Sequence, residues 1–452
     1  MKYSYYLLFL FLFSCKKEAP TTLPIVNQVV KTIEEPISGF KVNSNARLLG
    51  KDYWENTGVP SDLIGIKYLI SPRGFKSVGS SMTAVCGDFN NDGWIDVFQP
   101  GMSYDGVTNV SASFLIWNPI SKIFENKKLF NNNQIDLPRS NPPKVIPTYL
   151  NDDNYVDLII FGYYDEAKPE NPPTKMMLAI SDGKGNYDLK DITTETPTYY
   201  HYGGDLGDLN GDNIDDLVLN CGGLMKILWG SKSFPYFDES NSITFSNPQN
   251  RLQWTGVDFN FGNNNGFGDS NVSSLVWQFV HNCKISDVNK DGKNDIVLCS
   301  YDDSENSNKV LINLGAGRFN TQSIVNLPLY STDKSKNFVN IDYIIDDVNG
   351  DANKDIISLN ETDYKTWDIF IYLNQGDGTY KVDKSIIQYS LNRTRHGNWK
   401  HRLIYFDYDG DGKKDISYID DADNGESKYK SVFIRTNNQF IETDYYKFTS
   451  KY

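Results

Sequence analysis

The stretch Asp287-Val-Asn-Lys-Asp-Gly-Lys-Asn-Asp295, which runs directly into Ile-Val-Leu, decides the fold of this chain. It reads D-x-[DN]-x-D-[GNA]-x-x-D, and the same pattern begins again at Asp88, Asp208, Asp347 and Asp407. Short apolar runs open and close each copy, so we expect a strand on either side of an acidic turn. A single acidic turn would mean little, but five copies in register indicate a repeated site.

The residue types in this motif are typical of a calcium loop. Side-chain oxygens at positions 1, 3, 5 and 9, with the backbone carbonyl of position 7, can converge on one cation if the chain bends at position 6. Calcium accepts about six to eight oxygens in irregular geometry, whereas magnesium requires a near-ideal octahedron. The loop is not an EF-hand, because strands flank it and no Glu stands at position 12. We therefore predict about five calcium ions, with the ligands Asp88, Asn90, Asp92, Trp94, Asp96, Asp208, Asn210, Asp212, Ile214, Asp216, Asp287, Asn289, Asp291, Lys293, Asp295, Asp347, Asn349, Asp351, Asn353, Asp355, Asp407, Asp409, Asp411, Lys413 and Asp415.

A sixth copy, Tyr149-Leu-Asn-Asp-Asp-Asn-Tyr-Val-Asp157, has lost its first carboxylate. We expect the hairpin to persist there and calcium to bind weakly or not at all. Its remaining candidate ligands are Asn151, Asp153 and Asp157. A sixth ion is therefore left open.

The motif recurs at a nearly constant period, with starts 61, 59, 79, 60 and 60 residues apart. Such self-similarity is the mark of a repeat architecture. A later β-rich run ends in a glycine turn and an aromatic, in the stretches Ser181–Tyr187, Asn313–Phe319 and Asn374–Tyr380. Glycine supplies the positive φ that tight hairpins need, so we assign these turns to structure rather than to phosphate binding. One such unit fits a four-stranded propeller blade.

These segments resemble the FG-GAP or VCBS repeat, the blade of the integrin α-subunit propeller and of many bacterial surface proteins. The resemblance implies an all-β fold, a calcium-stapled β-propeller over residues 78–452 with six motif-bearing blades of four strands each. Residues 41–77 are expected to pack on the propeller or close it, and a seventh blade is left open. The longest interval predicts an insertion near 238–280.

The N-terminus reads as an export signal. Lys2 is followed by the apolar run Leu7–Phe13 and by Ser14-Cys15, which is too short to span a bilayer. Leu12-Phe-Ser-Cys15 resembles the bacterial lipobox, which implies cleavage after residue 14 and lipidation of Cys15. Residues 15–40 read as a flexible tether. We therefore expect an exported, membrane-anchored lipoprotein, in the outer membrane and facing the periplasm or the cell surface.

The net charge of −14 reflects the acidic loops, and calcium ions would neutralise much of it. No strongly basic region covers a domain, so nucleic acid is not expected as a partner. The membrane is expected to be reached through the lipid anchor alone, and the oligomeric state is left open.

Two cysteines flank one acidic loop. Cys283 and Cys299 lie four residues outside either end of Asp287–Asp295, so in a symmetric hairpin they would face each other across adjacent strands. A disulfide is allowed in an exported protein. Two small buried hydrophobic residues are the alternative.

Segments that lead into the first strands carry unusual residues. If the acidic loops lie on one face of the disc, these segments lie on the other, around the central channel. Aromatic rings stack on sugars, and Arg and Lys pair with carboxylates or sulfates. The candidate ligand-binding residues are Tyr200, His201, Trp277, His281, Arg393, Arg395, His396, Trp399, Lys400 and His401. The alternative is that these residues pack between blades.

These features favour a binding or adhesion module for a glycan or a surface protein. A polysaccharide lyase that uses the same face is one alternative, and a structural scaffold in a surface complex is another. We predict no catalytic residues, because no spacing fixes an acid–base constellation and the paired acids are assigned to calcium. The chain is therefore interpreted as a non-enzyme.

Overall fold

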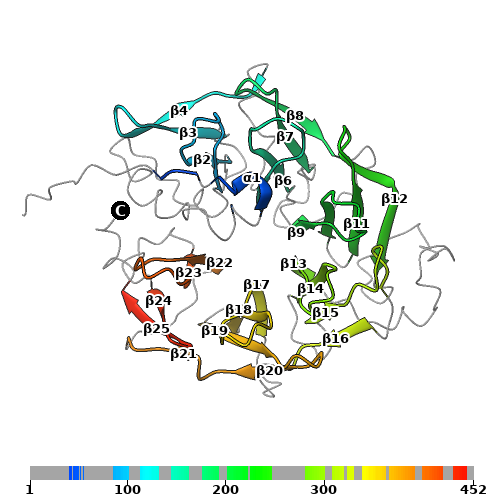
Figure 1. Cartoon of the computed structure of the whole chain (residues 1–452), viewed down its shortest axis with the longest axis vertical. Helices are drawn as coiled ribbons and strands as arrows, with labels where there is room; N and C mark the ends of the chain where they lie inside the picture. Colours follow the sequence, from blue (N-terminus) through cyan, green and yellow to red (C-terminus); the bar gives the residue numbers. More distant parts are fainter. Residues whose placement is uncertain are drawn as a thin grey trace, which may run out of the picture. The chain divides into compact units, whose positions relative to one another are not determined.

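Six antiparallel sheets follow one another along the chain and form the blades of a β-propeller (Figure 1). Our computed structural model describes residues 40–42, 44–49, 51, 54, 85–100, 112–131, 144–161, 176–192, 201–221, 224–246, 280–300, 308–319, 323–329, 338–362, 366–391, 400–420 and 431–444. All of them belong to the unit that spans residues 37–452. The predicted all-β fold with six four-stranded blades is thus confirmed.

Each blade is built from consecutive strands, and each strand pairs with its neighbours in chain order. Blades 1 to 3 contain β1 (Val85–Gly87), β2 (Asp96–Gln99), β3 (Ser113–Asn118), β4 (Ile123–Lys127), β5 (Val145–Thr148), β6 (Asp157–Ile160), β7 (Met177–Ser181), β8 (Tyr187–Asp191), β9 (His201–Gly207), β10 (Asp216–Cys221), β11 (Leu224–Gly230) and β12 (Phe237–Ser246). Blades 4 to 6 contain β13 (Val280–Ser286), β14 (Asp295–Ser300), β15 (Lys309–Leu311), β16 (Ile324–Asn326), β17 (Phe338–Asp346), β18 (Asp355–Thr362), β19 (Thr366–Asn374), β20 (Tyr380–Asp383), β22 (Lys400–Phe406), β23 (Asp415–Asp420), β24 (Ser431–Thr436) and β25 (Gln439–Asp444).

The first strand of each blade lies toward the centre of the ring. β9, β13, β17 and β22 contact one another in turn, as do β1 and β5, and Figure 1 shows the first strands facing inward. Their central residues are buried, and they include polar side chains such as Asp205, Asn282 and Asp342 beside apolar ones such as Leu206 and Leu403. Residues at the ends of these first strands therefore lie around the axis of the propeller.

A short extra strand joins the last two blades. β21 (Ile387–Gln388) follows β20 of blade 5 but pairs in parallel with Phe440 and Ile441 of β25, on the outer edge of blade 6.

Blade 6 is closed against blade 1 by apolar packing, since Ile404, Tyr408 and Val432 share a core cluster with the residues of blade 1.

The first strands of four adjacent blades carry a β-bulge at the same place. The pairing register skips one residue, six positions before the acidic loop. The skipped residues are Tyr202 in β9, His281 in β13, Ile341 in β17 and His401 in β22. A bulge changes the local twist and redirects the side chains that follow it.

The described part of residues 40–54 lies against the acidic loops of the first blades. Ile95 and Val42 donate backbone hydrogen bonds to Phe40 (2.8 Å) and Gly93 (3.0 Å) respectively. The short helix α1 (Ala46–Leu49) follows, and Lys51 forms an ion pair of 2.5 Å with Asp205 of blade 3. Among the described residues this segment adds no seventh blade.

One boundary prediction was wrong. The insertion was expected to begin near residue 238, but Phe237–Ser246 is β12, which pairs with β11 as the outer strand of blade 3. Any insertion begins after that strand, and residues 247–279 lie outside the described part of the chain. The prediction rested on the 79-residue interval between the third and fourth loops, and the length of an interval does not say where within it an insertion begins.

The export signal (1–14), Cys15 and the tether (15–40) lie, up to residue 39, outside the described residues, so these remain predictions. Within the described ranges no helix is long and apolar enough to cross a membrane.

Candidate metal centres

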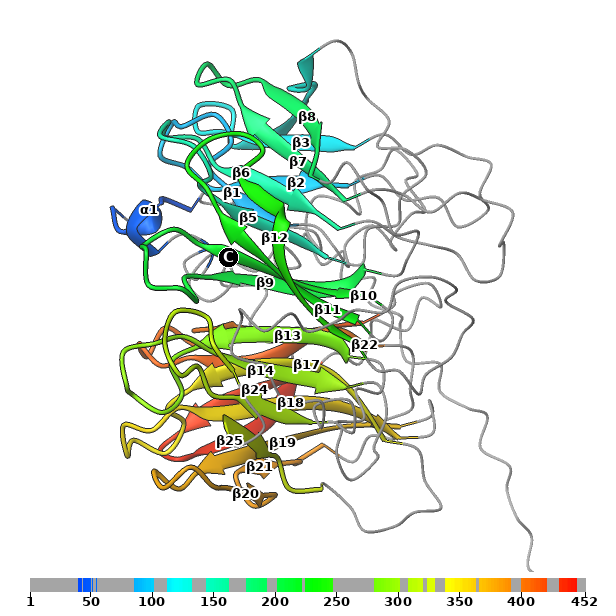
Figure 2. The same ribbon diagram turned by 90° about the vertical axis from the view of Figure 1, so that its right-hand side faces the viewer.

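Each acidic loop joins the first two strands of its blade, as predicted. Position 9 is the first residue of the second strand in all six blades, and it pairs with the residue that precedes position 1. In blade 6, for example, Phe406 pairs with Asp415. The loops are therefore eight-residue connections held at their base by the sheet. In the side view of Figure 2 they lie on the face of the ring where α1 is drawn.

The carboxylate at position 1 gathers the backbone of its own loop. Asp407 Oδ1 accepts hydrogen bonds from the backbone N–H groups of Gly410 (2.7 Å) and Asp411 (3.1 Å), and its Oδ2 accepts one from Gly412 (2.8 Å). Asp88, Asp208, Asp287 and Asp347 accept from positions 4 to 6 of their loops in the same way. This carboxylate therefore shapes the turn before any ion is considered.

Positions 3, 5 and 7 form a second ladder. Asp409 Oδ1 accepts from the backbone N–H of Asp411 (3.1 Å), and Asp411 Oδ1 accepts from that of Lys413 (2.8 Å). The same two bonds occur in all six loops, with Asn in place of Asp at position 3 in the other five. Side chains at alternate positions are thus turned toward the inside of the loop.

Two backbone positions take positive φ in every loop that begins with Asp. They are positions 4 and 6, occupied by Asn91 and Gly93, Gly211 and Asn213, Lys290 and Gly292, Gly350 and Ala352, and Gly410 and Gly412. Glycine and Asn adopt this region at the least cost, which explains why the motif favours them at position 6. The loop that begins with Tyr149 has positive φ at neither position.

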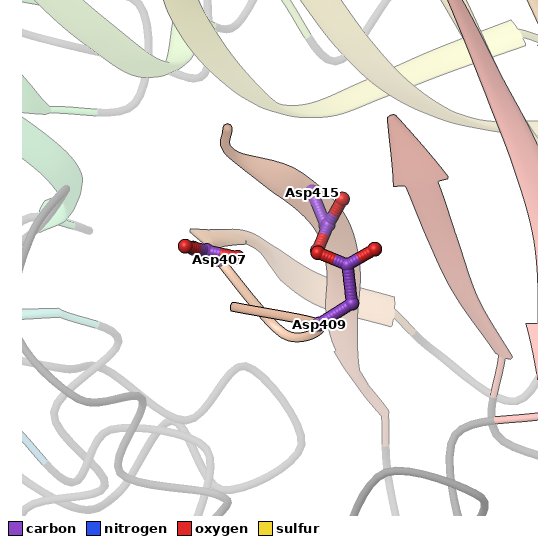
Figure 3. A group of neighbouring side chains, drawn as sticks. All are labelled: Asp407, Asp409 and Asp415. Carbon is purple, nitrogen blue, oxygen red and sulfur yellow. The ribbon is translucent and has the colours of Figure 1, made fainter. Parts of the chain in front are cut away.

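The loop of blade 6 brings three carboxylates together. One oxygen from each of Asp407, Asp409 and Asp415 lies within 4.8 Å of the others, and Figure 3 shows Asp409 beside Asp415, with Asp407 at the opposite side of the bend. An oxygen-only donor set in an irregular bend fits a hard divalent cation of the calcium type. The loop therefore fits a cation, and the four other loops with Asp at position 1 share its backbone geometry but carry one carboxylate fewer.

Position 9 has a structural role that the sequence analysis missed. Asp355 is fully buried; its Oδ2 accepts from the backbone N–H of Val348 (3.1 Å) and its Oδ1 from that of Asn374 (2.8 Å), in the third strand. The corresponding Asp accepts the same two bonds in the other five blades. Position 9 therefore ties the loop to the third strand, whether or not it also faces a cation.

Burial raises the pKa of these position-9 carboxyls, although the backbone N–H groups that they accept from act in the opposite direction. The pKa rises to about 6 for Asp216, Asp295 and Asp355, and to about 7 for Asp157 and Asp415. At position 5 the backbone N–H of position 7 lowers the pKa of Asp351 and Asp411. A cation at these loops would therefore compete with protons at position 9 near neutral pH.

A side-chain clamp connects each of several loops to the next blade. Asn374 Nδ2 donates to the carbonyl of Val288, at position 2 of the preceding loop (2.9 Å), and to that of Lys354, at position 8 of its own loop (3.2 Å). Asn313 makes the equivalent bonds to Leu209 and Asn294, and the Tyr187 hydroxyl lies 3.0 Å from the carbonyls of Phe89 and Val156. A residue of the glycine turn thus joins neighbouring blades: its first residue in blades 4 and 5, and the aromatic residue that ends it in blade 2.

The clamp varies at the remaining seams. Arg435 donates to the carbonyls of Asp347 (3.1 Å) and Val348 (2.9 Å) of blade 5, whereas blade 3 has Gly230 at the equivalent place. In blade 1 this place is taken by Trp117, whose buried Nε1 has no hydrogen-bond partner among the described residues. The glycine turns are visible in the sequence but the clamp is not, because one of its two acceptors lies in another repeat.

The clamp carries a testable consequence. Replacing Asn374, which is buried, with Ala leaves two backbone carbonyls without their donor. We expect a loss of about 2 kcal/mol in the free energy of unfolding, measured by urea denaturation. Gln375→Ala, at the exposed neighbouring side chain, is the matched control. Equal losses for the two variants would contradict the clamp.

The predicted ligand face is described only through its backbone. Tyr200, Trp277, Arg393, Arg395, His396 and Trp399 lie outside the described residues. His201, His281, Lys400 and His401 stand within the first two positions of β9, β13 and β22, at the strand ends opposite the acidic loops. Since β9, β13, β17 and β22 are adjacent, the backbone brings these four residues around one side of the ring axis.

The two cysteines beside the fourth loop do not face each other. Cys283 pairs with Leu298, and Cys299 pairs with Asn282. The expectation of directly opposed cysteines was wrong by one residue, because the strands pair Ser286 with Asp295. The register therefore removes the argument for a disulfide, and Cys283 is buried among apolar residues.

Among known protein families, one family model matches a part of the chain. Residues 347–418 match the model of a family described as FG-GAP-like repeat. This segment runs from the first Asp of the fifth loop through the sixth loop and into β23. No curated protein sequence matches the chain.

Solved structures similar to the chain include the exotype rhamnogalacturonan lyase YesX (12% identity, TM-score 0.40) and the rhamnogalacturonan lyase YesW (12%, 0.37). A third is the Bacillus licheniformis rhamnogalacturonan lyase PL11 (10%, 0.36). Each match covers 80% of this chain and 56 to 57% of the other, so the chain spans little more than half the length of these structures. Similarity this distant carries no argument about chemistry. Residues 347–418 therefore match the FG-GAP-like repeat family, as the resemblance implied, and the described residues form a six-bladed β-propeller.

Proposed function

We propose that this chain is an exported, lipid-anchored, calcium-binding propeller that binds a glycan on the face opposite its acidic loops. The observation that carries the binding role is the repeated bulge in the first strands. It lies six residues before the loop in four adjacent blades, and in two of them the bulged residue is His281 or His401. β-bulges are over-represented at sheet rims and next to active sites, where they redirect side chains, and this supports a ligand face at the bulged ends of these strands.

The chemistry of the neighbouring sequence supports a sugar. Trp277, Tyr200 and Trp399 stand in segments that lead into the first strands, and aromatic rings of this kind stack on sugar rings. Arg393 and Arg395 stand in a chain whose net charge is −14, and guanidinium groups pair with carboxylates. The preferred ligand is therefore a neutral or acidic polysaccharide.

Calcium has a supporting role in this proposal. The five loops with Asp at position 1 would each hold one ion through their oxygen side chains, and the bound ion would neutralise the carboxylates and stiffen the bend. Export fits this role, because calcium is plentiful outside the cytoplasm. The ligand face would then be held by a rigid ring.

The test is a glycan and polyuronate array with the mature protein in detergent, in calcium and in chelator. We expect retention on one class of glycan in calcium, and a loss of at least about tenfold in the variant Trp399→Ala/Arg395→Gln. The matched control is Phe234→Ala/Lys190→Gln, because Lys190 lies 5.9 Å from the ring of the exposed Phe234, at the turn between β11 and β12.

Three outcomes would count against the proposal. Equal loss in both double variants would show that the effect is not local to the predicted face. No retention on any glycan of the array would favour a surface protein as the partner or a scaffold role. New unsaturated ends on a polyuronate would replace the binding module with a lyase.

A further inference from the structure

The acidic loop of blade 2 differs from the other five around position 1, whereas the bonds at positions 3, 5 and 9 are the same. The backbone N–H groups of Asp153 and Tyr155 donate to the side chains at positions 3 and 5 (3.0 and 2.8 Å), and that of Leu150 donates to Asp157 at position 9 (2.7 Å). Position 1 is Tyr149, so this loop lacks the carboxylate that the other five loops have there. Since no carboxylate gathers the backbone N–H groups there, positions 4 and 6 do not take positive φ.

A guanidinium group from another segment lies against the part of the loop around Tyr149. Arg47 Nη1, from α1, donates to the backbone carbonyl of Asp153 and to Asn154 Oδ1 (2.7 Å). The guanidinium carbon lies 5.6 Å from the centre of the Tyr149 ring, a distance typical of a cation–π contact. One cationic group thus contacts positions 1, 5 and 6 of the loop.

Two further contacts position α1 for this interaction. On its N-terminal side, residues 40–42 are hydrogen-bonded to the loop of blade 1, and Lys41 Nζ lies 5.3 Å from the Trp94 ring. On its C-terminal side, Lys51 is paired with Asp205, and both side chains are nearly inaccessible to solvent. Arg47 is therefore presented to blade 2 from a segment that is anchored on blades 1 and 3.

We propose that the loop of blade 2 is not a calcium site and that the Arg47 guanidinium supplies its positive charge instead. The aromatic ring at position 1 provides a face for the guanidinium where a calcium loop would provide a carboxylate, and the carbonyl of Asp153 accepts its N–H. The loop becomes the docking point of α1. The part that concerns calcium rests on the proposed function of the other five loops, whereas the docking contact does not.

A gain-of-site experiment tests the first part. Tyr149→Asp/Arg47→Gln restores the motif, and Asn154 at position 6 matches Asn213, which takes positive φ in the loop of blade 3. We expect this double variant to bind one calcium ion more than the wild type, by metal analysis after gel filtration. Tyr149→Asp alone should add none, because Arg47 would pair with the new carboxylate. An extra ion in that single variant, or an unchanged count in the double variant, would overturn the proposal.

A metal-free measurement tests the docking. Hydrogen exchange of the amides of residues 46–49 should rise about threefold in Arg47→Gln, equally in calcium and in chelator, because the contact is exposed and therefore weak. Arg318→Gln is the control, since Arg318 Nε donates within its own turn. Unchanged exchange in Arg47→Gln would overturn the docking, even if the wild type bound no calcium at all. A wild type that binds no calcium, with exchange raised as expected, would reject the proposed function and keep the docking.

Discussion

Removal of calcium from the protein is expected to lower its melting temperature by roughly 10 to 15 °C. Each filled loop stabilises the folded state by about 2.7 kcal/mol when free calcium is 100 times the Kd. Five loops contribute together, against an unfolding entropy of about 2.1 cal/mol/K per residue. Without the ion, clustered carboxylates such as Asp407, Asp409 and Asp415 repel one another within 4.8 Å.

The measurement is a pair of thermal melts, in calcium and in excess chelator, for the wild type and three variants. Asp287→Ala and Asp407→Ala should each remove about one fifth of the calcium-dependent shift, since each empties one loop. Tyr149→Ala, in the loop that lacks the first carboxylate, should leave the shift unchanged. Identical wild-type melts in calcium and chelator would show that the loops are acidic turns without an ion.

Replacement of Asp355 by Ala is expected to destabilise the protein by about 3 to 5 kcal/mol in chelator as well as in calcium. The carboxylate is fully buried and accepts backbone N–H groups from Val348 and Asn374. Each N–H left unsatisfied inside the protein costs about 1 to 3 kcal/mol. Asp355→Asn keeps one acceptor oxygen and should lose about half as much.

Asp347→Ala, at position 1 of the same loop, is the matched control. Its carboxylate also accepts two backbone N–H groups, but the loop there is accessible to water, which can replace the lost acceptor. Its effect on the free energy of unfolding, measured by urea denaturation, should therefore appear mainly in calcium. If Asp355→Ala also left the free energy of unfolding unchanged in chelator, position 9 would be a metal ligand without the structural role argued above.

Local bonds explain how much of the fold could be predicted. In each loop that begins with Asp, the side-chain oxygens at positions 1, 3 and 5 accept from backbone groups no more than five residues away, so residue type and spacing suffice to recognise the turn. The constant period then leads from one hairpin to six blades. The loss of position 1 at Tyr149 was also visible in the sequence, and it correctly marked the loop that departs from the others.

Contacts between repeats could not be predicted in the same way. The bonds of Asn374 to Val288 and of Arg47 to the loop of blade 2 join residues 86 and more than 100 positions apart. The register that separates Cys283 from Cys299 depends on which residue of β13 pairs first with β14. No pattern within one repeat specifies these choices.

The amino-acid sequence by itself thus determined the all-β class, the six blades and the positions of the acidic loops, because period-two strands and side-chain-to-backbone turns are local. Only the tertiary structure decided that position 9 ties each loop to the third strand, that a residue of the glycine turn joins blades 1 and 2, 3 and 4, and 4 and 5, and that Arg47 contacts the loop of blade 2. Those interactions join groups that the folded chain brings together from separate strands or repeats, so no pattern within a single turn specifies them.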